Sequence, residues 1–89
     1  MSDTKKPAAK IVLYPVSAAI WRNQNQKGAF YSVTFERSFK DDTGNYKSTD
    51  SFTASDLLLL AKIADQAHTE VLRLRALDRQ AGQGDFEAA

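Results

Sequence analysis

Apolar and polar residues alternate along the first half of the chain, as they do in strands with one buried face. The run 10–22, "KIVLYPVSAAIWR", is rich in β-branched and aromatic residues, and Pro15 divides or ends it because proline cannot donate to a strand ladder. Two further alternating runs cover 29–40 and 45–52, and the period then becomes helical over about 54–77. The pattern predicts an α+β fold, in which a twisted antiparallel sheet of three to four strands is followed by one long C-terminal helix.

The segments between these runs carry turn and cap signals. "NQNQKG" and "DDTG" are expected turns, the second with Gly44 at a positive φ. "TASD" begins the helix, with Thr53 as its cap and Asp56 in its first turn. A chain of 89 residues is enough for one domain with a modest core. We expect a flexible basic arm at 1–9, a single domain at 10–77 and a disordered tail at 78–89.

The two hairpins decide which residues share a face of the sheet. With Arg22 opposite Ala29 and Lys40 opposite Asn45, the apolar residues of all strands fall on one face, Tyr46 among them. A slip of one residue in either hairpin would exchange the faces, because the side-chain period of a strand is two. The agreement between the hairpins favours this register.

The opposite face then carries two aromatic residues, Trp21 beside Phe30, and one helix covers only the other face of so small a sheet. Exposed rings among hydroxyls and cations are typical of surfaces that stack the bases and neutralise the phosphates of a single strand. The alternative is that the two rings form a structural cross-strand pair or a buried subunit contact. The candidate nucleic-acid contacts are Trp21, Arg22, Lys27, Phe30, Lys40 and Lys47.

The expected helix is more apolar than the coverage of one sheet face requires. Its length of about 24 residues extends roughly 36 Å, farther than a sheet of three or four strands is wide. The stripe expected to cover the sheet is Leu57, Leu60, Ala61, Ala64, Ala67, Val71 and Leu74. A two-fold dimer would bury the apolar residues that remain, whereas an overlong helix with solvated leucines is the alternative. The expected dimer-interface residues are Leu58, Leu59, Ile63 and Leu72.

Composition and charge narrow the class of protein. A 43% apolar share and a 26% charged share are ordinary for a globular chain, and the absence of cysteine excludes disulfides and thiolate chemistry. We see no apolar region of a secretory signal near the start, and "LLLLA" is far too short to span a bilayer. Residues 1–40 carry seven Lys/Arg against two Asp/Glu, and residues 41–89 carry five against nine. This asymmetry is a weak indication of a surface that faces a polyanion.

Candidate chemistry is sparse. His68 is the only histidine and falls on the apolar side of the helix, where a packed or interface role is more typical than catalysis. No residues show the spacing of metal ligands, and the glycines of "QKGAF" and "AGQGDF" do not form a phosphate-binding loop. We therefore expect no enzyme, no metal and no cofactor.

The stretch "IWRNQNQKGAFYSVTFERSFKDDTGNYKSTDSFTASDLLLLAKIADQAH" contains a "KDDTG" hairpin with a following Lys47 and a "SFTASDLLLL" entry to the helix. This arrangement resembles the family of positive cofactor four and its bacterial and phage homologues, the single-stranded-DNA-binding transcriptional coactivators to which the plant Whirly proteins are related. The likeness is architectural and covers about residues 10–77. It implies a homodimer whose sheets bind single-stranded nucleic acid with little sequence preference, through the six contacts named above.

The leading hypothesis is a single-stranded nucleic-acid-binding protein, with DNA favoured, that acts in transcription, replication or repair. Its partners would be single-stranded DNA or RNA and a second copy of the chain, with no membrane and no small-molecule substrate. We expect a cytoplasmic location, of the bacterial or phage nucleoid-associated kind. The alternative is a protein–protein interaction or assembly module in which the face of Trp21 and Phe30 docks another protein.

Overall fold

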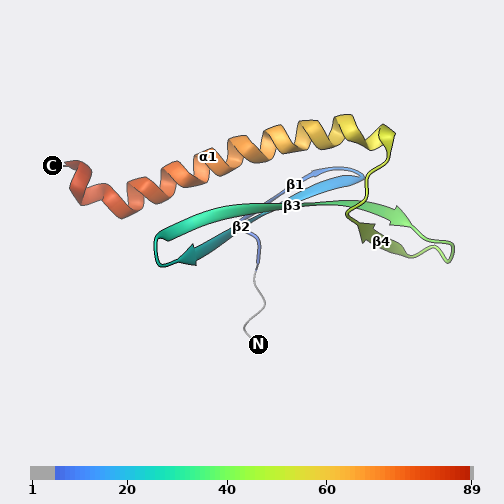
Figure 1. The fold of residues 1–89 in the computed structure, drawn as a ribbon, viewed down its shortest axis with the longest axis horizontal. Coiled ribbons are helices and arrows are strands. Elements are labelled where there is room, and N and C mark those ends of the chain that lie inside the picture. Colours follow the sequence, from blue (N-terminus) through green and yellow to red (C-terminus); the bar gives the residue numbers. More distant parts are fainter. Residues whose placement is uncertain (1–5, 89) are drawn as a thin grey trace.

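The computed structural model describes the backbone of residues 6–88 and the side chains of residues 6–80. Four antiparallel strands form one sheet in the order β1-β2-β3-β4, and a short 3-10 turn leads into a single long helix that lies over one face (Figure 1). The predicted α+β fold is confirmed, with Pro15 in the turn that divides the first apolar run into two strands. The elements are β1 (Ala9–Leu13), β2 (Val16–Asn25), β3 (Gly28–Lys40), β4 (Tyr46–Thr49), η1 (Ala54–Asp56) and α1 (Leu57–Ala88).

The core is a thin layer between α1 and the middle of the sheet. The buried apolar residues come from β2 and α1 and are Val16, Ala18, Ile20, Ile63 and Ala67. Partly buried side chains from β1, β3 and the rest of α1 pack around them. The molecule measures 60 × 35 × 17 Å along its principal axes, so it is two layers thick. Among the described residues, no helix or strand covers the other face of the sheet.

The β2–β3 hairpin differs from the expected register by two residues. Arg22 pairs with Tyr31 instead of Ala29, because the strands continue to Asn25 and Gly28 and only a two-residue turn joins them. Gly28 takes a φ of 125°, and the Lys27 N–H donates to Oδ1 of Asn25 at 2.8 Å, which together close the turn. A shift of two preserves the faces, so the predicted division of β2 and β3 between the two faces holds.

The β3–β4 hairpin differs by one residue, which reverses the faces of β4. Lys40 pairs with Tyr46 rather than Asn45, and the turn between them is organised by Asp41. Oδ1 of Asp41 accepts hydrogen bonds from the Thr43 N–H at 2.9 Å and from the Asn45 N–H at 3.0 Å. Tyr46 was expected on the apolar face; the structure places it on the face that α1 does not cover.

The start of the helix follows the predicted cap. Oδ2 of Asp56 accepts hydrogen bonds from the Thr53 N–H at 2.9 Å and from the Thr53 hydroxyl at 2.8 Å. Arg37 from β3 completes the cluster, with its Nε 3.1 Å from the same carboxylate oxygen. The Thr53 hydrogen bonds, and then the charge of Arg37, lower the pKa of Asp56, which is 7% exposed. The cluster ties the beginning of the helix to the sheet.

The helix departs from the sequence expectation at its end and in its orientation. It continues to Ala88 rather than ending near residue 77, so much of the expected 78–89 tail is helical. The stripe that faces the sheet centres on Ile63 and Ala67, whereas Ala61 and Ala64 of the expected stripe are exposed. Of the expected 1–9 arm, residues 1–5 lie outside the described residues, and Ala9 belongs to β1.

This orientation corrects part of the expected dimer interface. Ile63 is fully buried in the core of its own chain, and Leu59 is partly buried against that core, so neither offers the surface expected of it. Leu58 is 84% exposed and Leu72 is 47% exposed, on the side of α1 that faces away from the sheet.

Candidate nucleic-acid interface

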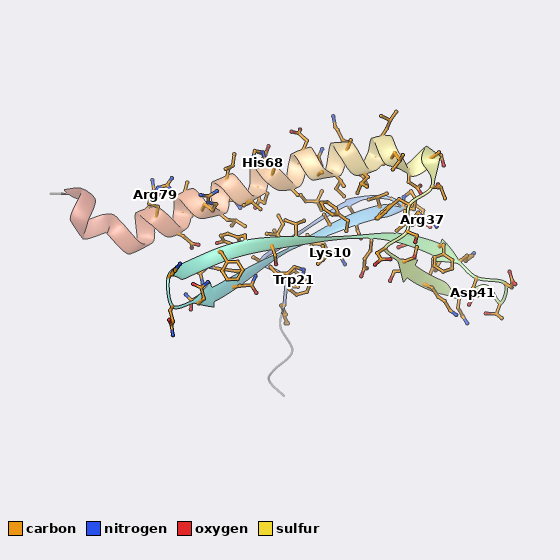
Figure 2. The ribbon with its side chains drawn as sticks, in the orientation of Figure 1. Lys10, Trp21, Arg37, Asp41, His68 and Arg79 are labelled. Atoms are coloured by element: carbon orange, nitrogen blue, oxygen red, sulfur yellow. The ribbon has the colours of Figure 1, made fainter. Side chains whose placement is uncertain are left out.

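The sheet face that α1 leaves uncovered is here called the distal face. Strand pairing assigns its residues, because side chains at paired positions point to the same side of a sheet. Figure 2 shows Trp21 on this side, pointing away from the helix. The distal-face residues are Lys10, Val12, Ser17, Ala19, Trp21, Asn23, Phe30, Ser32, Thr34, Glu36, Ser38, Lys40, Tyr46 and Ser48.

A hydrogen bond orients Trp21 at the centre of this face. Its indole Nε1 donates to the hydroxyl of Thr34 on the neighbouring strand at 2.9 Å. A hollow of about 200 Å³ lies beside the indole, and Lys10 and Glu36 belong to its lining. A ring that is held in place and borders an open hollow can present a fixed surface to a planar ligand at little entropic cost.

Phe30 is 47% exposed on the distal face, whereas Trp21 is half-buried there, and Phe30 is not the direct partner of Trp21. Trp21 pairs with Ser32, and Phe30 pairs with Asn23, because of the two-residue shift in the hairpin. The expected side-by-side aromatic pair is therefore a diagonal one. Diagonal neighbours in an antiparallel sheet are about 7–8 Å apart, still within reach of large rings.

The basic residues divide between the two faces. Lys27 lies at the exposed tip of the β2–β3 hairpin, and Lys40 lies on the distal face. Lys10 joins them, since β1 pairs it with Ala19 on the same face, two positions from Trp21 along β2. Lys10 was not among the contacts predicted from the sequence. Its position next to the apolar Ile11 could have indicated that it lies on the uncovered face, because neighbouring residues of a strand point to opposite sides.

Arg22 and Lys47 lie on the other face, apart from Trp21. Arg22 points to the same side of β2 as the buried residues Ala18 and Ile20, because it alternates with them along the strand. Its Nε lies 3.2 Å from Oδ2 of Asp78 on α1. The Lys47 Nζ lies 3.3 Å from Oδ2 of Asp41, and the one-residue register shift pairs Lys47 with Phe39. These two predicted contacts are thus placed away from the aromatic residues, and each is in an ion pair.

Asp78 joins the long helix to the hairpin of β2 and β3. The Tyr31 hydroxyl donates to its Oδ2 at 2.6 Å, and Arg22 contacts the same oxygen. The hydrogen bond from Tyr31 and then the one from Arg22 lower the pKa of Asp78. A hollow of about 420 Å³ lies beside this cluster, lined in part by Arg75 and Arg79.

Metal sites and membrane-spanning helices are the two other features that the described residues bear on. No group of three or more His, Cys, Asp and Glu side chains could hold a metal ion there. His68 is exposed on α1 (Figure 2). Within the same residues, no helix combines the length and the apolar character needed to cross a bilayer. Comparisons with protein families, curated proteins and solved structures find no match to this chain.

Proposed function

We propose that the chain binds single-stranded nucleic acid, with DNA favoured over RNA, through the distal face of its sheet. The observation that carries the proposal is the position of Trp21, which lies on the uncovered face, is oriented by Thr34 and borders a hollow. A base stacked on an aromatic side chain is worth about 1–3 kcal/mol whatever its sequence, because every base has a π-face. Such a protein would act in transcription, replication or repair without performing chemistry.

The cations around the face supply the second part of the mechanism. Lys10 flanks the hollow beside Trp21, Lys27 lies at the hairpin tip, and Lys40 lies at the far end of β3. Each lysine that neutralises a phosphate releases a counterion, which makes affinity depend on salt. Glu36 is exposed among these lysines and repels phosphates. The sugar–phosphate backbone of the bound nucleic acid should therefore pass to one side of Glu36, while the bases face the sheet.

A fluorescence titration tests the proposal directly, because Trp21 is the only tryptophan in the chain. Oligothymidine added at about 50 mM and about 200 mM salt should quench Trp21, with affinity that falls steeply between the two. The absence of quenching at the lower salt concentration would contradict the proposal.

A protein-docking role for the same face is the second candidate. Phe30 exposes 47% of its surface and Val12 exposes 57%, and apolar side chains of this kind are also found in protein interfaces. The salt series separates the two candidates, since a protein interface built on these residues has no polyanion to release counterions.

We also propose that the chain forms a homodimer through the outer side of α1. Leu58 and Leu72 support this, because they are exposed on the same side of the helix and stand about 21 Å apart along its axis. Contact between two such helices would leave both distal faces free, since the sheet lies on the other side of α1 (Figure 1). Sedimentation velocity of the intact protein measures the oligomeric state.

A further inference from the structure

A second group of exposed aromatic residues lies at the end of β3 away from Trp21 and Phe30, with Tyr46 on the distal face and Tyr14 in the turn between β1 and β2. Tyr14 and Tyr46 each expose 64% of their surface. Tyr46 pairs with Lys40 in the β3–β4 register, and the Lys40 Nζ lies 5.4 Å from the centroid of its ring. Tyr14, Lys40 and Tyr46 are together called the tyrosine station.

Two contacts bring Tyr14 to this end of the sheet although β1 and β4 are its opposite edges. The Ser38 N–H donates to the carbonyl oxygen of Pro15 at 2.8 Å, which joins the β1–β2 turn to β3. Ser38 pairs in turn with Ser48 of β4. A hydrogen bond links the side chains of Tyr14 and Tyr46 and raises the pKa of Tyr14.

We propose that the tyrosine station is a second base-stacking site, and that a single strand lies along the distal face from Trp21 and Phe30 to Tyr14 and Tyr46. The inference rests on the proposed function and extends it to a minimum length of ligand. The ten-residue step from Phe30 to Lys40 covers roughly 33 Å at ~3.3 Å per strand residue. At ~3.4 Å per nucleotide of a continuously stacked strand, a ligand that reaches both ends needs at most about ten nucleotides, and an extended ligand needs fewer.

The chemistry of the station favours a nucleic acid over an apolar protein surface. Lys40 is in none of the ion pairs found among the described residues, so its charge is available to a phosphate, whereas Lys47 nearby is paired with Asp41. A cation beside a ring can serve the phosphate and the base of one nucleotide together. Between the two ends of the distal face, the serine and threonine hydroxyls of β3 offer hydrogen-bond donors to the bound nucleic acid.

The test compares two ligand lengths in the intact protein, with quenching of Trp21 as the common readout. Oligothymidines of about 4 and about 16 nucleotides span the known range of site sizes for such proteins. Tyr46→Ala should weaken binding of the long oligonucleotide by about five- to 150-fold, which corresponds to ~1–3 kcal/mol per stacked base. The same variant should leave binding of the short one, measured as quenching of Trp21, unchanged.

Tyr46→Phe is the matched control, because it keeps the ring and removes the hydroxyl; it should bind both lengths as the parent chain does. Circular dichroism melts of both variants show whether the fold is retained. If both lengths quench Trp21 and neither depends on Tyr46, the tyrosine station is overturned while the proposed function stands. If neither length quenches Trp21 in the parent chain, both proposals are overturned.

Discussion

The indole N–H of Trp21 donates a hydrogen bond to the Thr34 hydroxyl, 2.9 Å away across the β2–β3 pair, on the sheet face that α1 leaves uncovered. The hydrogen bond to Thr34 fixes the orientation of the Trp21 indole on this face. A tryptophan packed under the helix would belong to the core, whereas this one is oriented by a polar neighbour and keeps an open hollow beside it. The relationship therefore links the strand register directly to the proposed binding surface.

Replacement of Trp21 by alanine should weaken oligothymidine binding by about five- to 150-fold, the equivalent of ~1–3 kcal/mol for one stacked base. The thermal melt should remain cooperative, because the buried core lies on the other side of the sheet. Fluorescence anisotropy of a labelled oligonucleotide measures this loss without the tryptophan signal. Trp21→Phe, which keeps an aromatic face, should retain most of the affinity. Loss of the cooperative melt in Trp21→Ala would instead show that the indole stabilises the fold.

Leu58 and Ile63, one exposed and one buried on α1, should respond differently to replacement by aspartate. Leu58→Asp should leave the melt nearly unchanged, since a surface substitution shifts stability by about 0.5 kcal/mol or less. The same variant should dissociate the proposed dimer. Ile63→Asp should unfold or strongly destabilise the chain, because an uncompensated buried charge costs roughly 3–5 kcal/mol. Sedimentation velocity and thermal melts measure the two effects. An unchanged sedimentation coefficient in a dimeric Leu58→Asp protein would place the interface elsewhere.

Acid should weaken the anchor of the helix start through Asp56. Its hydrogen bonds from Thr53 and the charge of Arg37 lower its pKa in the folded state, so the unfolded state binds the proton more readily. The stability that this carboxylate contributes is present above the unfolded pKa of about 3.9 and is lost as the pH falls through the lower folded pKa. Denaturant unfolding across this pH window should show a smaller loss of stability in Asp56→Asn than in the parent chain. Equal pH slopes would argue against this role.

Removal of the Asp78 carboxylate should loosen the later part of α1 while its beginning stays in place. Asp78 accepts hydrogen bonds from Arg22 and Tyr31, and Asp78→Ala removes both of these contacts with the sheet. Amide hydrogen exchange should become faster around residue 78, whereas the turns around Ile63 should keep their protection. Asp65→Ala, at an exposed position of the same helix, is the matched control and should change neither region.

Much of the fold follows from the pattern of the sequence. Alternation in β2 and β3 predicts which side of the sheet each residue takes, Pro15 marks the division of β1 from β2, and Thr53 with Asp56 marks the helix start. These features depend on neighbours within a few residues, where the local backbone chemistry is decisive. The position of Trp21 on the uncovered face belongs to the same group, because it requires only the period of a strand and one helix to cover one face.

The tertiary structure decided the register and the partners of the charged residues. Asp41 accepts hydrogen bonds from the backbone of Thr43 and Asn45, and this turn moves β4 by one position, which brings Tyr46 to the distal face. Likewise, Arg22 contacts Asp78, 56 residues away in the sequence, instead of joining the lysines. The physical reasons differ. A change of one residue in a turn reverses every side chain of the next strand, and alternation within the strands does not specify the length of the turn. An ion pair across the fold depends on where the helix lies, which periodicity also leaves open.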